Sequence, residues 1–426
     1  MKLVKLSLAT MVALGTSAFA ADSLATMFKD GKISGEVRSM YINNDIGAIA
    51  PAVDGEGFAV GGKLKFETAS YMGITLGTAF YTAQGLGANS VAELAGTNSN
   101  LLDTNGKSYS LFGEAYVQYN HSNTMIKIGR QQINTPLIDA DDMRMIPDLF
   151  EAYLLTNTDF ADTTLVLAHL TQMAGTIDTW AINGHNFESM SDSAGLTVNG
   201  KDEGVTLASA TYNGFADTTL QAWYYTLSGD LDAWYLQADY AWDCKIIDGM
   251  QMSGAIQYIN FDADNTLVAG GFDYNIWGAK IEGAHTSGFG FDLAYNDYSD
   301  DTTTTGAVTT TTGAYSGIWG GYPEFAVADE YWATSGAVTA NTNAWRVGAS
   351  YDFAKSGVDG LSASVAYVTF DNDVADTDVD VIDFIVNYDV QAIANLSTYV
   401  VYEDVSRDTA AGVDSDIFKI YVGYTF

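Results

Sequence analysis

Residues 131–150 read QQINTPLIDADDMRMIPDLF, and they interrupt a region that otherwise alternates between apolar and polar side chains. Pro136 and Pro147 exclude a continuous strand here, because proline has no N–H to offer to a β-ladder. The segment nevertheless carries Leu, Ile, Met and Phe side chains, for which a free surface loop would have no use. We therefore predict that this third long loop folds inward between the walls of a barrel, where its carboxylates narrow a pore.

The sequence on both sides of this loop has the two-residue period of β-strands. In residues 111–119, Val117 and Tyr119 fall on one face, whereas Glu114 and Gln118 fall on the other. An apolar face opposite a polar one is expected of a strand that separates lipid from water. Comparable runs recur along the chain, about eighteen in all, and bacterial single-chain outer-membrane barrels have an even number of strands.

The connections between these runs alternate in length. The short turn at residues 121–124 contrasts with the long segments 84–107, 171–203 and 299–343, and all four prolines fall in connections. The last strand must pair with the first, because an open sheet edge in lipid leaves backbone groups unsatisfied. We predict an all-β fold, a transmembrane antiparallel β-barrel of about 18 strands with an inward-folded third loop, as the single domain of residues 21–426.

Residues 1–20 have the features of a secretory signal peptide. A basic start with Lys2 and Lys5 precedes the mostly apolar run Leu6–Leu14. The small residues of Ala18-Phe19-Ala20 then provide a cleavage site. Without this segment the chain has 16 basic and 53 acidic residues, a formal charge of −37. Such a charge argues against nucleic acid as a partner, and it suits an acidic mouth that gathers cations.

The side chains that catalysis needs are scarce. Four histidines are scattered without the spacing of a zinc site, and no nucleophile elbow or phosphate-binding loop occurs. The single cysteine, Cys244, excludes an intramolecular disulfide. The acidic residues 371–380 lack the turn glycine and terminal glutamate of an EF-hand, so we predict a solvated loop, with loose calcium binding as the alternative. We therefore predict a protein that is not an enzyme and has no cofactor or dedicated metal site.

The candidate pore constriction begins with the carboxylates of the third loop. Asp139, Asp141 and Asp142 form an acidic row, and Arg144 follows two residues later. An acidic row that faces a basic row across a narrow opening would create a transverse field, which orients dipolar solutes and sets ion preference. The sequence leaves open the alternative of solvated charges in a wide lumen.

Charged residues of the strands complete the predicted constriction. We assign Glu114 and Arg130 to it. For Arg130 this requires a bulge or strand end at Gly129, because its parity is that of the apolar Ile126 and Ile128. The opposing basic wall of the lumen is predicted to comprise Arg38, Lys63, Lys65, Lys127 and Arg346.

Several stretches resemble known bacterial porins. Residues 1–8, MKLVKLSL, resemble the signal start of the major outer membrane porin of Campylobacter-type bacteria. Residues 127–134, KIGRQQIN, are similar both to that porin and to the OprD family of specific porins. Residues 138–151, IDADDMRMIPDLFE, resemble the OprD pattern more, and residues 326–332, AVADEYW, are also similar to these porins.

The resemblance implies an eighteen-stranded barrel, a homotrimer and a third loop folded inside. Relatives in the OprD family usually carry a ladder of lumen arginines that leads carboxylate-bearing solutes inward. In this sequence arginine is sparse, which puts that preference in doubt. The Campylobacter-type relatives favour cations and are associated with calcium, which suits a charge of −37 better, and the choice stays open. The arginines are Arg38, Arg130, Arg144, Arg346 and Arg407.

The predicted function is that of a porin in the bacterial outer membrane. It would be a passive diffusion channel for ions and small hydrophilic solutes, with an acidic loop constriction. Its partners would be outer-membrane lipid, these solutes and further copies of the chain. The alternative is a structural or adhesive surface barrel with an occluded lumen, a reading motivated by the Thr-rich residues 301–312 and the long loops.

Overall fold

The computed structural model describes most of the chain from residue 21 onward. The predicted signal peptide and parts of the long loops, among them Pro51 and residues 331–332 and 373–376, lie outside the described residues. The described ranges are 21–46, 55–87, 101–103, 106–175, 186–193, 203–228, 230–263, 272–299, 302–305, 308–311, 319–330, 341–372, 377–408 and 414–426.

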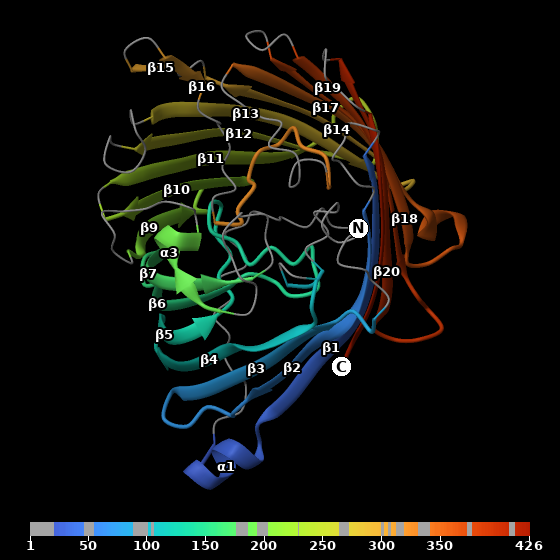
Figure 1. Cartoon of the computed structure of the whole chain (residues 1–426). Coiled ribbons are helices and arrows are strands. Elements are labelled where there is room, and N and C mark those ends of the chain that lie inside the picture. Colours follow the sequence, from blue (N-terminus) through green and yellow to red (C-terminus); the bar gives the residue numbers. More distant parts are fainter. Residues whose placement is uncertain are drawn as a thin grey trace.

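Eighteen antiparallel strands form a barrel, as predicted, and each pairs with its neighbours along the chain (Figure 1). The two-residue strand β8 (Glu188–Ser189) pairs with β7 inside the fourth long connection. The barrel strands are β1 (Lys32–Ile46), β2 (Gly55–Glu67), β3 (Ile74–Gln84), β4 (Tyr109–His121), β5 (Thr124–Gln131), β6 (Leu149–Asn157), β7 (Thr163–Ala174), β9 (Val205–Tyr212), β10 (Thr218–Leu227), β11 (Leu231–Asp243), β12 (Met250–Ala263), β13 (Phe272–His285), β14 (Phe289–Tyr298), β17 (Thr342–Asp352), β18 (Leu361–Asn372), β19 (Thr377–Asp389), β20 (Leu396–Asp408) and β21 (Ser415–Thr425).

The first and last strands close the barrel. β1 pairs with β21 in antiparallel register from Glu36 opposite Thr425 to Ile46 opposite Ser415. Beyond this ladder, Gly35 and Phe426 exchange two backbone hydrogen bonds of 3.0 Å each. Closure leaves the sheet without a free edge, so the backbone groups of every barrel strand find partners on both sides.

Small elements lie outside the barrel wall or in the long connections. They are α1 (Leu24–Lys29), α3 (Met190–Ser193), the hairpin of β15 (Thr302–Thr305) with β16 (Val308–Thr311), and the 3-10 helix η2 (Phe353–Ser356). The hairpin falls within the Thr-rich residues 301–312. Among the described residues, no helix is long or apolar enough to cross a membrane.

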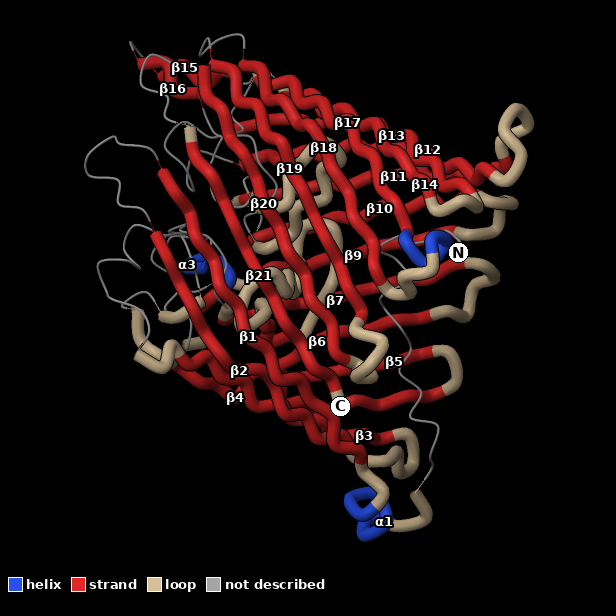
Figure 2. The backbone as a smooth tube through the Cα atoms, turned by 90° about the vertical axis from the view of Figure 1, so that its right-hand side faces the viewer, coloured by secondary structure: helices blue, strands red, loops and turns tan. Residues whose placement is uncertain are grey.

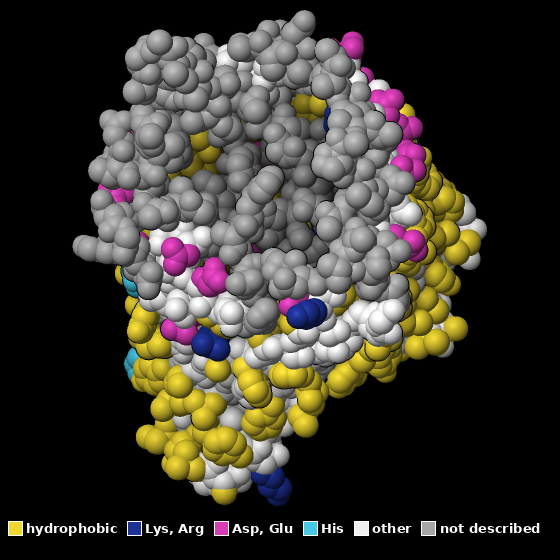
Figure 3. Space-filling model, in the orientation of Figure 1, with side chains coloured by type: hydrophobic (Ala, Val, Ile, Leu, Met, Phe, Trp, Pro, Cys, Tyr) yellow, Lys and Arg dark blue, Asp and Glu magenta, His cyan; other side chains and the backbone are white. Residues whose placement is uncertain are grey.

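The two-residue alternation places one face of each strand outside and the other in the lumen. On β4, Val117 and Tyr119 are exposed outward, whereas Glu114 and Gln118 are buried inside, as predicted. Apolar side chains accordingly cover the outer wall in the space-filling view (Figure 3). The short turns gather at one end of the barrel, which also holds the C-terminus (Figure 2).

The core lies inside the barrel, where the strands lead into the long connections. There the inward side chains Trp223, Tyr225 and Phe261 are buried in one apolar cluster. Two inserted segments complete the cluster: loop 3 (residues 132–148) and the loop 7 segment (residues 319–330). Burial of apolar surface therefore holds these segments within the lumen. Their buried members are Ile133, Leu137, Ile138, Trp319, Ala326 and Ala328.

Candidate functional site: a constriction built by two inserted loops

Loop 3 turns into the lumen at a short self-bonded corner. The Thr135 N–H and hydroxyl both donate to the carbonyl of Ile138, at 2.7 and 2.8 Å, and the Ile138 N–H donates back to the Thr135 hydroxyl at 3.1 Å. Pro136 fits this corner because it needs no hydrogen bond for a backbone N–H. Leu137 and Ile138 follow, and both are fully buried. The apolar content of the loop thus faces the core, and the prediction of an inward-folded loop is confirmed.

The loop 7 segment lies directly against loop 3. Ile138 makes backbone bridges to Trp319 and Gly320, and the Asp139 N–H donates to the Trp319 carbonyl at 3.3 Å. The next residue, Gly321, packs so tightly that a Cβ there would lie 2.3 Å from the carbonyl oxygen of Pro136. A side chain at position 321 would therefore push the two segments apart.

Polar side chains of three wall strands hold the loop 7 segment. Gln257 on β12 donates to the carbonyl of Pro323 at 2.8 Å. The Asn296 side-chain oxygen, on β14, accepts the N–H groups of residues 325 and 326, at 2.8 and 2.7 Å. Arg346 on β17 donates to the carbonyl of Val327 at 2.8 Å. These bonds satisfy backbone groups that would otherwise be buried without partners.

Arg346 also belongs to an acidic part of the wall. Its Nε donates to Asp292 at 2.9 Å, and its Nη1 lies 3.8 Å from Asp383. The side chain faces inward, as predicted for the basic wall. Two carboxylates and a carbonyl already surround the guanidinium, so little positive charge is left for a passing solute.

A buried ionic cluster joins the two inserted segments to the barrel. Arg144 of loop 3 pairs with Glu330 of the loop 7 segment at 3.0 Å, and both side chains are almost completely buried. Lys419 on β21 also pairs with Glu330 and with Asp329, the latter at 3.3 Å. The Glu330 N–H donates to Glu403 on β20 at 2.7 Å. Arg144 therefore fastens the loops together instead of lining the opening, which differs from the prediction.

Arg38 and Asp142 do not face each other across the opening. Arg38 on β1 donates two hydrogen bonds to Asp142, at 2.6 and 2.9 Å, and pairs with Glu36 at 2.6 Å. It also donates to the Arg144 carbonyl at 2.8 Å. Arg38 is buried, whereas the Asp142 side chain is half exposed. The expected acidic and basic rows are in contact here, because loop 3 leans onto the wall that was expected to oppose it.

The remaining basic wall residues lie inward on β2 and β5, as predicted. Lys65 pairs with Glu114 at 2.7 Å, and Glu114 accepts a further bond from the Tyr81 hydroxyl at 2.8 Å. The Lys127 ammonium lies 3.9 Å from the centroid of the Tyr116 ring. Lys63 is partly exposed on the same face of β2 as Lys65. Glu114 is thus a buried residue of the barrel wall, which differs from the prediction that it belongs to the constriction.

Arg130 lies on the outward side of β5, and its assignment to the constriction is wrong. It keeps the parity of Ile126 and Ile128, although Gly129 has the positive φ of 117° that accompanies a local distortion. Its Nε pairs with Glu151 at 3.3 Å, and its guanidinium lies 4.0 Å from the centroid of the Phe187 ring. The distortion at the glycine does not reverse the alternation of the strand.

Asp139 and Asp141 are partly exposed residues of loop 3, and neither takes part in an ion pair among the described residues. Burial raises the pKa of Asp139 to about 7, and the charge of Asp141 contributes to the shift. Burial likewise raises the pKa of Asp141 to about 6, against the opposing effect of the Arg144 charge. The charges of Asp139 and Asp141 therefore change near neutral pH. Together with the half-exposed Asp142, they form an acidic edge of the inserted loop.

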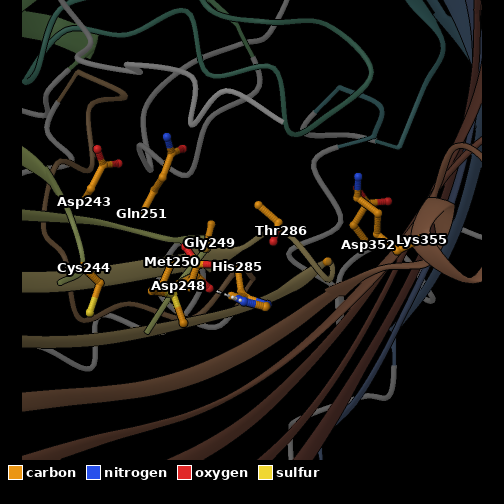
Figure 4. A pocket seen from close by; sticks show the side chains of 12 residues that line it. Asp243, Cys244, Asp248, Gly249, Met250, Gln251, His285, Thr286, Asp352 and Lys355 are labelled. Carbon is orange, nitrogen blue, oxygen red and sulfur yellow. Dashed lines mark hydrogen bonds between the residues drawn. The ribbon is translucent and has the colours of Figure 1, made fainter. Parts of the chain in front are cut away.

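A second hollow lies at the opposite mouth, among the short turns. This cavity of about 400 Å³ is lined by residues of the β11–β12, β13–β14 and β17–β18 turns (Figure 4). Three carboxylates and one ammonium group contribute to its lining, so the cavity is acidic. Its charged residues are Asp243, Asp248, Asp352 and Lys355.

Sequence reasoning missed the residues that hold the loop 7 segment. Gln257, Asn296, Glu330, Glu403 and Lys419 received no role, although Glu330 lies in a stretch that resembles porins. Pro323 with its apolar neighbours was the available signal, since it repeats the pattern that marked loop 3. In the part of the chain that the structure describes, no three His, Cys, Asp or Glu side chains gather as a metal site. Calcium binding stays a prediction.

Comparison with known proteins shows a match over almost the whole chain. A family model described as outer membrane porin, OprD family, matches residues 25–426. No curated protein sequence matches.

Three solved structures show the similarity of fold. The structure of Pseudomonas aeruginosa OccK9 (OpdG) aligns with a TM-score of 0.76 at 18% identity, covering 94% of this chain and 99% of that one. The BenF-like porin of Pseudomonas fluorescens aligns with a TM-score of 0.75 at 16% identity, and the P. aeruginosa OpdK structure with vanillate at 0.74 and 19%. Both of these alignments also cover 94% of this chain and 99% of the other.

Proposed function

Because the chain belongs to the OprD family of outer membrane porins, we propose that it is a diffusion channel whose constriction favours cations. One observation supports the ion preference: Asp139, Asp141 and Asp142 are the partly or largely exposed charged residues of the inserted loop, whereas Arg38 and Arg144 are buried and each pairs with a carboxylate. The charge that a passing solute meets at the inserted loop is therefore negative.

The mechanism needs only water, a narrow opening and fixed charge. Loop 3 and the loop 7 segment reduce the cross-section of the barrel, so a permeating ion passes close to the carboxylates. The low dielectric of the surrounding protein strengthens their attraction for cations compared with bulk water. The acidic lining of the cavity among the short turns acts in the same direction at the other mouth.

The test is the reversal potential of single channels in a planar bilayer under a salt gradient. We expect cation preference in the wild type and a clear shift toward zero in Asp139→Asn/Asp141→Asn/Asp142→Asn. As a matched control, Asp162→Asn/Asp217→Asn/Asp359→Asn removes three charges from exposed turns at the far end of the barrel. An unchanged reversal potential in the loop variant would refute the proposal of an acidic constriction, but it would be compatible with a diffusion channel.

The occluded surface barrel is the second candidate, and the Thr-rich hairpin of β15 and β16 is what favours it. A properly folded protein that passes no current in the bilayer would support it over a conducting channel. The family is one of channels and not of enzymes, and we propose no catalytic activity. The expected homotrimer is a separate proposal that rests on the resemblance alone. The mass of the protein–detergent complex, measured by light scattering, tests it.

A further inference from the structure

The N-terminal arm, residues 21–31, is built into the fold at the end of the barrel that carries the short turns. A capping box starts its helix α1: the Ser23 hydroxyl accepts the Thr26 N–H at 3.2 Å, and the Thr26 hydroxyl accepts the Ser23 N–H at 2.9 Å. Met27 is buried, and its carbonyl accepts the N–H of Ala69, before the β2–β3 turn, at 3.0 Å. The arm therefore has a fixed orientation relative to β1, β2 and β3.

One face of this arm is apolar and exposed, and none of the residues that the structure describes covers it. Leu24 and Phe28 stand one helical turn apart on the same side of α1, and 63% and 52% of their surfaces are exposed. Met72 at the tip of the β2–β3 turn adds a third apolar side chain that is 78% exposed. Apolar side chains dominate this lower end of the molecule in Figure 3.

This apolar face continues the lipid-facing wall of the barrel. Ile33, at the start of β1, is 68% exposed on the outer side, and Ile74, at the start of β3, is also exposed. α1 lies beyond the outer wall, where these strands begin, in both views of the chain (Figures 1 and 2). The surface of a porin wall is covered by lipid, so the occupant of a surface continuous with it is lipid too.

The residues at the tips of the other short turns also fit a position at the membrane surface. Phe160, Phe215 and Ile246 are exposed at the tips of three further short turns, beside charged residues such as Asp159 and Asp217. A mixture of apolar and charged groups is typical of the boundary between acyl chains and headgroups. We propose that the arm is an interfacial anchor, with Leu24, Phe28 and Met72 inserted into the phospholipid leaflet at this mouth.

The test uses a nitroxide spin label in the full-length protein reconstituted into phosphatidylcholine bilayers. The only cysteine is removed by Cys244→Ser, and labels are attached through Phe28→Cys, through Asp30→Cys as the water-facing control, or through Val117→Cys in the lipid-facing wall. Relaxation by oxygen, which concentrates in lipid, is compared with relaxation by a water-soluble nickel chelate. All three labelled positions are exposed, so the barrel should fold in every variant.

We expect the ratio of oxygen to nickel relaxation at position 28 to be several-fold higher than at position 30 and close to that at position 117. Equal access of both reagents at positions 28 and 30 would place the arm in water and overturn the proposal. Exclusion of both reagents at position 28 would indicate that a second copy of the chain covers this face, and this result would also overturn the proposal. Neither result bears on the ion preference, so the two proposals fail separately.

Discussion

Glu330→Gln should loosen the two inserted loops, and the size of the effect follows from the ionic cluster. Glu330 is fully buried between Arg144 of loop 3 and Lys419 of β21. Lys419 keeps Asp329 as a partner at 3.3 Å, whereas Arg144 loses its only carboxylate among the ion pairs of the described residues. Leaving a buried charge without its partner costs on the order of 3–5 kcal/mol.

For Glu330→Gln we use the lower end of this range of free energies, because the neutral glutamine can still accept a hydrogen bond from Arg144. A loss of about 3 kcal/mol lowers the ratio of docked to undocked loops roughly a hundredfold, since about 1.4 kcal/mol corresponds to a factor of ten. In single-channel recordings the variant should show frequent current steps and higher open-channel noise than the wild type. The double variant Arg144→Met/Glu330→Gln should be quieter than Glu330→Gln, because it no longer contains a buried guanidinium that has lost its carboxylate partner. Noise in Glu330→Gln equal to that of the wild type, or a double variant at least as noisy as the single one, would refute this account of the cluster.

Three further results are expected. Cation preference should fall as the pH decreases from 8 to 5, because the pKa of Asp139 is raised to about 7 and its carboxylate becomes neutral within this range. A reversal potential that stays constant across this range would contradict the prediction. Asn296→Ala removes the acceptor of the N–H groups of residues 325 and 326, of which the second is buried and costs about 1–3 kcal/mol when left unpaired. The loop 7 segment should therefore fluctuate and the current become noisier, and a steady current would count against that role. Arg130→Gln should leave the reversal potential unchanged, because the side chain lies on the outward side of β5; a shift would return this residue to the constriction.

The strands and their faces could be predicted because their signal is local. Alternation with a period of two fixes which side of a strand each residue occupies, and Glu114 and Lys65 lie inward for that reason. Arg130 shows the strength of the rule. Its place in the alternation of β5 predicted an outward side chain, whereas its assignment to the constriction required an inward one. The alternation gave the correct side even though the preceding glycine has a positive φ.

The partners of the charged residues could not be read in the same way. Arg38 bonds to Asp142, 104 positions along the chain, and Arg144 bonds to Glu330, which is 186 positions away. Such contacts depend on how two long loops fold against the barrel wall. The alternation of residues along a strand carries no information about this arrangement. Asn296 and Gln257 were missed for a related reason, since polar side chains on the inner face are expected whether they meet water or a loop.

The seam between β1 and β21 carries charged groups that hold both inserted segments. Arg38, which binds loop 3, comes from the first strand, and Lys419, which binds the loop 7 segment, comes from the last. The two strands pair with each other, and Ile42 lies opposite Lys419 in their register. The buried cluster of Arg144, Glu330 and Lys419 is therefore complete only when the C-terminal strand is in place. A barrel whose seam was open would lack Lys419, which is part of the cluster that holds the loop 7 segment in the lumen.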